Sequence, residues 1–126
     1  MVDSFMLLAM DDQDFLSSFE RCTLPKEHFN HAGHVRLAWL YLERHPFDEA
    51  VTRTCDGIRA YAAHLGAADK FHRTITEALM HLLRAHGRDA VLADARGMLA
   101  LHYSPSLLAE AHARERFVPP DREPLP

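Results

Sequence analysis

The chain has 126 residues, of which 48% are hydrophobic and 25% are charged, a balance that excludes a wholly disordered protein. This length suits one core, so we expect residues 1–126 to form a single helical domain. The formal net charge is −4 and the 14 Lys and Arg residues are scattered among 18 Asp and Glu residues, which argues against a nucleic-acid partner.

Apolar residues recur along most of the chain with the spacing of amphipathic helices, and no alternating stretch is long enough to indicate a sheet. The pattern therefore predicts an all-α fold, a helical bundle of five or six helices. These helices are expected over residues 11–22, 31–45, 47–65, 70–86 and 90–101, followed by a short one over residues 104–110.

Polar residues that suit N-caps precede several of these helices: Asn30, Asp69, Asp89 and Ser104. Pro105 directly follows Ser104, at the first helical position, where proline is favoured. The last eight residues hold four prolines, so we predict an extended tail over 116–126. This tail either lies across its own bundle or docks on a partner or a second copy of the chain, as in a homodimer.

The start of the chain does not have the features of an export signal. Asp3 stands where a signal peptide needs positive charge, and the apolar run from Phe5 to Met10 is short. No stretch approaches the roughly 18 apolar residues that a membrane span needs. Cys22 and Cys55 have no metal-ligand spacing and are expected to be free thiols. We therefore expect a cytoplasmic location and no membrane partner.

The main chemical feature is a pair of histidines at the start of the second predicted helix. Residues three or four apart share a helix face, so His31 and His34 lie on the same stripe as Val35, Ala38 and Leu42. That stripe is the one expected to face the core. Both imidazoles are therefore predicted to point inward.

A third histidine heads an apolar stripe on the fourth predicted helix. His72 is followed at helical spacing by Ile75, Thr76, Leu79 and Leu83. Short loops would bring the second and fourth helices together with their starts at the same end of the bundle. We therefore expect His72 to converge with the histidine pair.

Three converging imidazoles suit a divalent transition metal, and zinc is the first expectation, with iron or copper as alternatives. The predicted ligands are His31, His34 and His72, and three protein ligands leave one position open. Zinc there would lower the pKa of a bound water to about 7, which suits a hydrolase or lyase acting on a small molecule. The expected supporting residues are Thr76, His28, Glu27 and Tyr41.

Two other functions remain open on the same residues. The first is a metal-free module that binds a small ligand in a histidine-lined pocket, with Trp39 and Tyr41 as aromatic walls. The second is a structural or interaction protein that uses its Pro-rich tail. The chain has no HExxH, GxSxG or glycine-rich phosphate loop, which removes support for the enzyme classes that carry these motifs.

Two short segments and the Pro-rich C-terminal end resemble a family of small, mostly uncharacterised bacterial helical proteins. The segments are residues 29–34, FNHAGH, of pattern FxHxxH, and residues 71–76, FHRTIT, of pattern (F/Y)HxTIT. The resemblance covers nearly the whole chain. It implies the same three histidines as site residues and implies no particular reaction.

Overall fold

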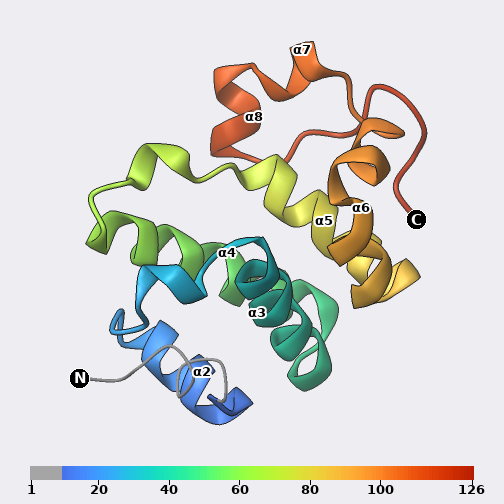
Figure 1. Ribbon diagram of the computed structural model, residues 1–126. Helices are drawn as coiled ribbons and strands as arrows, with labels where there is room; N and C mark the ends of the chain where they lie inside the picture. Colours follow the sequence, from blue (N-terminus) through green and yellow to red (C-terminus); the bar gives the residue numbers. More distant parts are fainter. Residues whose placement is uncertain (1–9) are drawn as a thin grey trace.

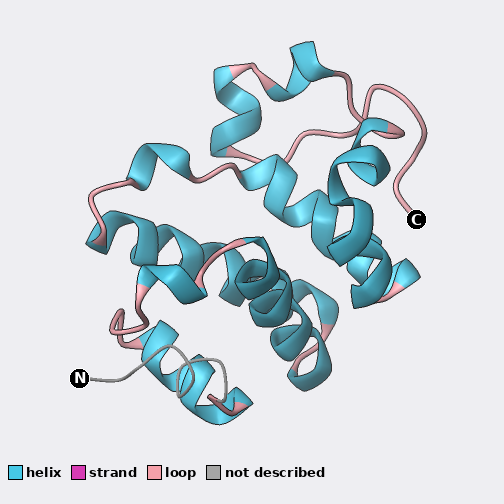
Figure 2. Ribbon diagram, in the orientation of Figure 1, coloured by secondary structure: helices cyan, strands magenta, loops and turns pink. Residues whose placement is uncertain are grey.

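The computed structural model describes residues 10–126. Within this part of the chain it has seven α-helices and no strands, which confirms the all-α prediction (Figure 1; Figure 2). The α-helices are α2 (Asp12–Glu20), α3 (His31–Arg44), α4 (Phe47–His64), α5 (Arg73–His86), α6 (Arg88–Ala100), α7 (Pro105–Leu108) and α8 (Ala111–Glu115). Two 3-10 turns, η1 (Lys26–His28) and η2 (Ala68–Lys70), precede α3 and α5.

The short helix predicted over residues 104–110 is two helices in the structure. Ser104 caps α7 as expected, because its hydroxyl accepts a hydrogen bond from the Leu107 N–H at 3.2 Å, and Pro105 is in the first turn. Glu110 then takes up an extended conformation, with φ −72° and ψ 141°, and a new helix starts after it. The described helices therefore exceed the expected five or six.

The start of α3 agrees with the prediction and the start of α5 does not. The Asn30 side chain accepts a hydrogen bond from the Gly33 N–H at 2.9 Å, so it is the N-cap of α3. The prediction that Asp69 caps the next helix is wrong, because Asp69 lies inside η2. The N-cap of α5 is His72, whose Nδ1 accepts from the Ile75 N–H at 3.1 Å.

The start of α6 also differs from the prediction. Asp89 is not its N-cap, because α6 begins at Arg88, two residues before the predicted start at residue 90, and follows Gly87 directly. Gly87 has φ +86°, a left-handed conformation that ends α5 and suits glycine. Within α6, Asp94 is non-helical and its Oδ1 accepts from the Gly97 N–H at 3.0 Å, so it caps a second helical segment.

Helices α3, α4, α6 and α8 all contact α5, whereas α2 contacts α4. Figure 1 shows α5 between α3 and α4 on one side and α7, α8 and the C-terminal tail on the other. The larger apolar core contains buried side chains from α2 to α6, and Phe15, Leu37 and Tyr61 are among the most buried of these. A smaller core joins Ala78 of α5 to Tyr103 and Val118.

The C-terminal tail lies across its own bundle. It is extended, as predicted, and the buried Val118 anchors it. The Tyr103 hydroxyl donates to the Val118 carbonyl at 2.7 Å. Thr74 of α5 donates to the Arg116 carbonyl at 2.9 Å and accepts from the Val118 N–H at 3.2 Å. The tail is thus held by α5 and by the residues just before α7.

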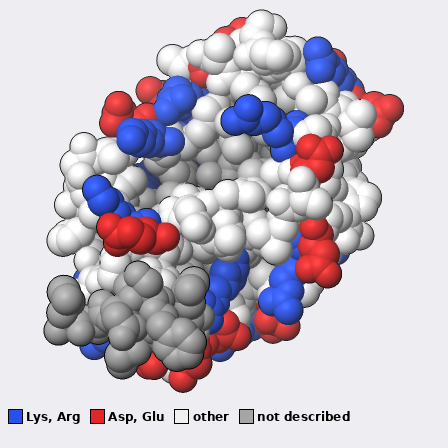
Figure 3. Space-filling view, in the orientation of Figure 1, with Lys and Arg blue, Asp and Glu red and all other residues white. Residues whose placement is uncertain are grey.

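Figure 3 shows positive and negative side chains interspersed on the face of the molecule that Figure 1 presents. In the described part of the chain, no helix is both long enough and apolar enough to cross a membrane. Asp3 and all of the apolar run from Phe5 to Met10 except Met10 itself lie outside the described residues.

Candidate ligand-binding cavity

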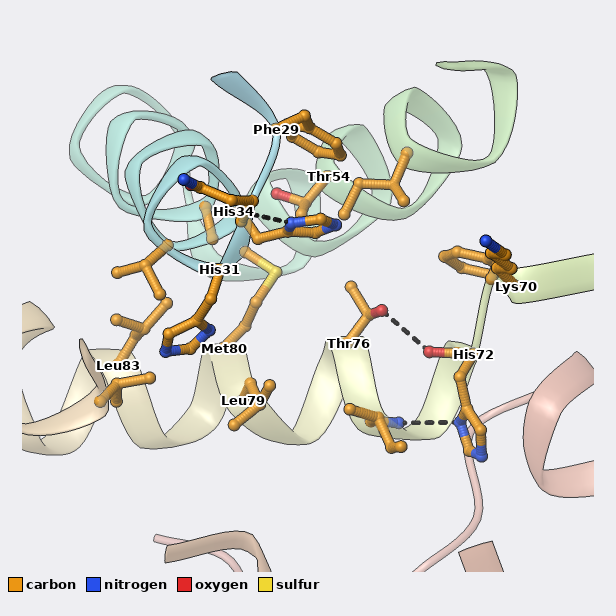
Figure 4. Close-up of a pocket in the computed structure, with 17 residues that line it drawn as sticks. Phe29, His31, His34, Thr54, Lys70, His72, Thr76, Leu79, Met80 and Leu83 are labelled. Carbon is orange, nitrogen blue, oxygen red and sulfur yellow. Dashed lines mark hydrogen bonds between the residues drawn. The ribbon is translucent and has the colours of Figure 1, made fainter. Parts of the chain in front are cut away.

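A cavity of about 420 Å³ lies between α3, α4 and α5 (Figure 4). This volume is within the usual range for small-molecule sites. Most of its wall is apolar and includes Val35, Ile58, Leu79 and Met80. The polar residues of the wall are Asn30, His31, His34, Thr54, Lys70, His72 and Thr76.

The imidazole of His34 has a fixed orientation in this cavity. Its Nδ1 lies 2.8 Å from the Asn30 carbonyl oxygen, and its ring centroid lies 3.9 Å from that of Phe29. A carbonyl only accepts hydrogen bonds, so we assign the proton of the neutral ring to Nδ1. Nε2 then carries a lone pair. Figure 4 shows the ring extending from α3 into the space above α5.

Burial lowers the pKa of His34 from the ordinary value of 6.5. The hydrogen bond to the Asn30 carbonyl opposes this shift, and the nearby His31 adds to it. The residue His34 is exposed, but its side chain also lines the cavity and its ring packs on Phe29, so protein atoms surround part of the ring. At neutral pH the ring is therefore uncharged, with Nε2 available as a hydrogen-bond acceptor.

The lowered pKa predicts a pH dependence of stability. The unfolded chain protonates His34 near pH 6.5, whereas the folded protein resists protonation until the pH reaches the lowered pKa. The contribution to the free energy of unfolding is therefore fully present above about pH 6.5 and is lost as the pH falls to the lowered pKa.

We expect His34→Phe to make the free energy of unfolding less dependent on pH between about pH 7 and 5. Urea denaturation at a series of pH values measures this. Burial also lowers the pKa of His81, so part of the dependence remains in the variant. Identical pH profiles for the variant and the parent protein would contradict the environment assigned to His34.

The ring of His72 points away from the other two histidines, although the residue lines the same cavity (Figure 4). Its Nδ1 accepts from the Ile75 N–H, and its Nε2 lies 2.8 Å from the Leu108 carbonyl oxygen. A neutral imidazole with its proton on Nε2 satisfies both bonds. The side chain is only 8% exposed and joins the start of α5 to α7.

His31 contributes a second imidazole to the cavity wall, and the residue is exposed. Figure 4 shows its ring directed toward α5, near Leu79 and Leu83. The fold thus brings all three predicted histidines to one cavity but does not bring their rings together. Within residues 10–126, no group of three or more His, Cys, Asp or Glu side chains has an arrangement that could hold a metal ion.

A three-histidine metal centre would require His72 to break both of its hydrogen bonds and turn toward the cavity. The first of these bonds caps α5 and the second reaches Leu108. Zinc, iron or copper bound by His31, His34 and His72 therefore stays a prediction.

The predicted supporting residues have different positions. Thr76 lines the cavity, and its hydroxyl donates to the His72 carbonyl at 2.8 Å. Tyr41 is buried in the core, and burial raises its pKa to about 12. Glu27 and His28 form part of η1. Four residues are not in the cavity wall: Tyr41, Glu27, His28 and Trp39.

Sequence reasoning missed Thr54 of α4, which is 1% exposed and lines the cavity. Its buried hydroxyl oxygen has no hydrogen-bond partner. Figure 4 shows this oxygen on the side of the cavity where His34 lies. Thr54 follows Ala50 and Val51 at helical spacing, so a polar residue on this apolar stripe was the available signal.

Sequence reasoning also missed Lys70 as a residue of the cavity wall. Lys70 ends η2 and lines the cavity just before α5. Phe29 lies directly before the Asn30 N-cap, where an apolar residue can pack against the first turns of the helix. In the structure Phe29 packs on the ring of His34 instead of serving only the helix start.

Comparison with known proteins adds no assignment. No protein-family model, curated protein or solved structure gives a significant match to the chain. The resemblance of residues 29–34 and 71–76 to a bacterial helical family therefore stays a prediction. The function is therefore inferred from the cavity and from the side chains that line it.

Proposed function

We propose that the protein binds a small, mainly apolar molecule in the cavity without a metal, and that His34 accepts a hydrogen bond from it. The observation that carries this proposal is the fixed imidazole of His34. Its Nδ1 is held by the Asn30 carbonyl, which leaves Nε2 without a partner among the described residues. A ligand with an O–H or N–H group matches this acceptor.

The rest of the cavity supports the same proposal. Apolar side chains such as Ile58, Leu79 and Met80 favour an apolar ligand, because contact with the ligand removes their surface from water. The unpartnered hydroxyl of Thr54 is a second polar group in the wall. Buried polar groups without partners are uncommon, and binding sites are among the places where they occur.

The same geometry suits proton transfer. A neutral imidazole that is oriented through Nδ1 can take a proton at Nε2 from a bound hydroxyl group. Binding is the proposed function, and a reaction would use His34 as the general base.

Phenol and toluene test the proposal, because they have similar shapes and only phenol donates a hydrogen bond. Titration of the ¹⁵N-labelled protein should shift amide signals of residues in the cavity wall at millimolar concentrations. We expect phenol to bind about tenfold more tightly than toluene, as a hydrogen bond of about 1.4 kcal/mol would produce. Absence of shifts with both compounds would overturn the proposal.

His34→Phe tests the role of the imidazole. Phenylalanine keeps a ring that can pack on Phe29 but removes the acceptor. The variant should bind phenol and toluene with equal affinity. His64→Phe is the matched control, because His64 is exposed at the end of α4 and is not in the cavity wall. An undiminished preference for phenol in His34→Phe would rule out His34 as the acceptor.

Metal analysis of protein purified without a His tag separates this proposal from the metal-dependent enzyme. Close to one equivalent of zinc, iron or copper that is lost in His72→Ala would favour the enzyme with a histidine-bound metal. Less than about a tenth of an equivalent, unchanged in His72→Ala, favours metal-free binding.

A further inference from the structure

We infer that the natural ligand of this cavity is an apolar carboxylic acid that also carries the O–H or N–H donor for His34, and that its carboxylate binds near Lys70. This inference rests on the proposed function and goes further, since it assigns the charge of the ligand and the end of the cavity that recognises it. Its basis is the distribution of charged side chains in and around the cavity wall.

The residues that line the cavity include Lys70 and no Asp or Glu. Lys70 is exposed and forms no ion pair with another described residue. Its ammonium group therefore has no protein counter-charge of its own. In a cavity wall without carboxylates, this charge favours a negatively charged group and disfavours a positively charged one.

Other groups around η2 add to the positive character of this end of the cavity. The Arg59 guanidinium lies 4.9 Å from the ring centroid of Phe71, which lines the cavity directly after Lys70. Arg114 donates a hydrogen bond to the carbonyl of Asp69, so a third cation lies at η2. Asp69 is the one acidic residue of η2, and it is not in the cavity wall.

The arrangement separates the charged end of the cavity from its apolar part. Figure 4 shows Lys70 beside the start of α5, and Leu79 and Leu83 further along the same helix. A carboxylate near Lys70 would remain close to solvent, because Lys70 is exposed, and would need to lose little of its hydration. The apolar part of the ligand would contact Ile75 and Leu79.

Two probes of similar shape test the charge: 3-phenylpropanoate, an anion, and 3-phenylpropanamide, which is neutral. Isothermal titration at low salt should show that the anion binds about three- to tenfold more tightly, the scale expected for a partly exposed ion pair. Addition of about 0.5 M NaCl should reduce this preference because salt screens exposed charges.

Lys70→Met tests whether Lys70 is responsible for the preference for the anion. It should remove the preference for the anion and leave the affinity for the amide unchanged within about twofold. Lys26→Met is the matched control, because Lys26 is exposed in η1 and does not line the cavity. This control should retain the full preference.

The outcomes distinguish this inference from the proposed function. Equal binding of the two probes, no binding of 3-phenylpropanoate, or an undiminished preference in Lys70→Met would overturn the inference. None of these results bears on the hydrogen bond to His34, which is tested by comparing the affinities for phenol and toluene. Failure of phenol and toluene to bind would instead remove the proposed function.

Discussion

Thr74→Val is expected to lower the free energy of unfolding by about 2 to 4 kcal/mol, the cost of leaving two hydrogen-bonding groups unpaired. The Thr74 hydroxyl donates to the Arg116 carbonyl and accepts from the Val118 N–H. Thr74 is 0% exposed and Val118 is 8% exposed, so water cannot readily replace these bonds. Valine has nearly the same shape and helix propensity as threonine, and the effect therefore isolates the hydroxyl.

Thr54→Val is the matched comparison, and its expected effect has the opposite sign. The Thr54 hydroxyl is as deeply buried but has no partner, so removing it should raise the free energy of unfolding by about 1 kcal/mol. Both residues lie in helices that line or adjoin the cavity. The same substitution should thus destabilise the protein at Thr74 of α5 and stabilise it at Thr54 of α4.

Urea denaturation of the two variants measures both effects, and hydrogen exchange at Val118 reports on the tail directly. Loss of the acceptor at Thr74 should accelerate exchange of the Val118 amide in Thr74→Val and leave it unchanged in Thr54→Val. Equal destabilisation by the two substitutions would show that the hydrogen bonds do not govern the difference.

Gly33→Ala is expected to lower the free energy of unfolding by about 2 to 3 kcal/mol, the scale of overpacking a closely packed site. A Cβ atom on Gly33 would lie 2.0 Å from the His28 carbonyl oxygen and 3.0 Å from its carbon. These are backbone atoms, so relief requires a shift of η1 or of the start of α3. Such a shift would also disturb Asn30, which orients His34.

Helix propensity alone predicts the reverse, because alanine is favoured over glycine within a helix by about 1 kcal/mol. Ala32→Gly is the control, since Ala32 is exposed in the same turn and should lose only that amount. Thermal denaturation compares the two variants, and phenol titration reports on the cavity. A stability gain in Gly33→Ala would contradict the close contact between Gly33 and His28.

Local patterns in the sequence predicted much of the fold. The apolar spacing predicted the helices that became α2 to α6, because an amphipathic helix repeats every 3.6 residues whatever it packs against. Asn30 and Ser104 were recognisable as N-caps, because a cap bonds to a backbone group only three residues away. Asp69 and Asp89 show the limit of this reasoning, since neither is the cap that its residue type suggested.

The candidate site was only partly predictable. Helical spacing predicted that His31, His34 and His72 would converge, and all three residues line one cavity, but their rings do not come together (Figure 4). It missed Thr54 and Lys70, which come from other elements, because contacts between elements distant in sequence leave no local periodic signal.

The sequence by itself determined that the chain is helical and that His31 and His34 share a face, since both follow from local geometry. Only the tertiary structure decided where the ring of His72 points. Two hydrogen bonds hold this ring away from the other histidines. One comes from the first turn of α5, and the other reaches Leu108, which is 36 residues away in the chain. A buried imidazole forms hydrogen bonds with groups that tertiary packing brings close to it, and helical periodicity does not predict which groups these are.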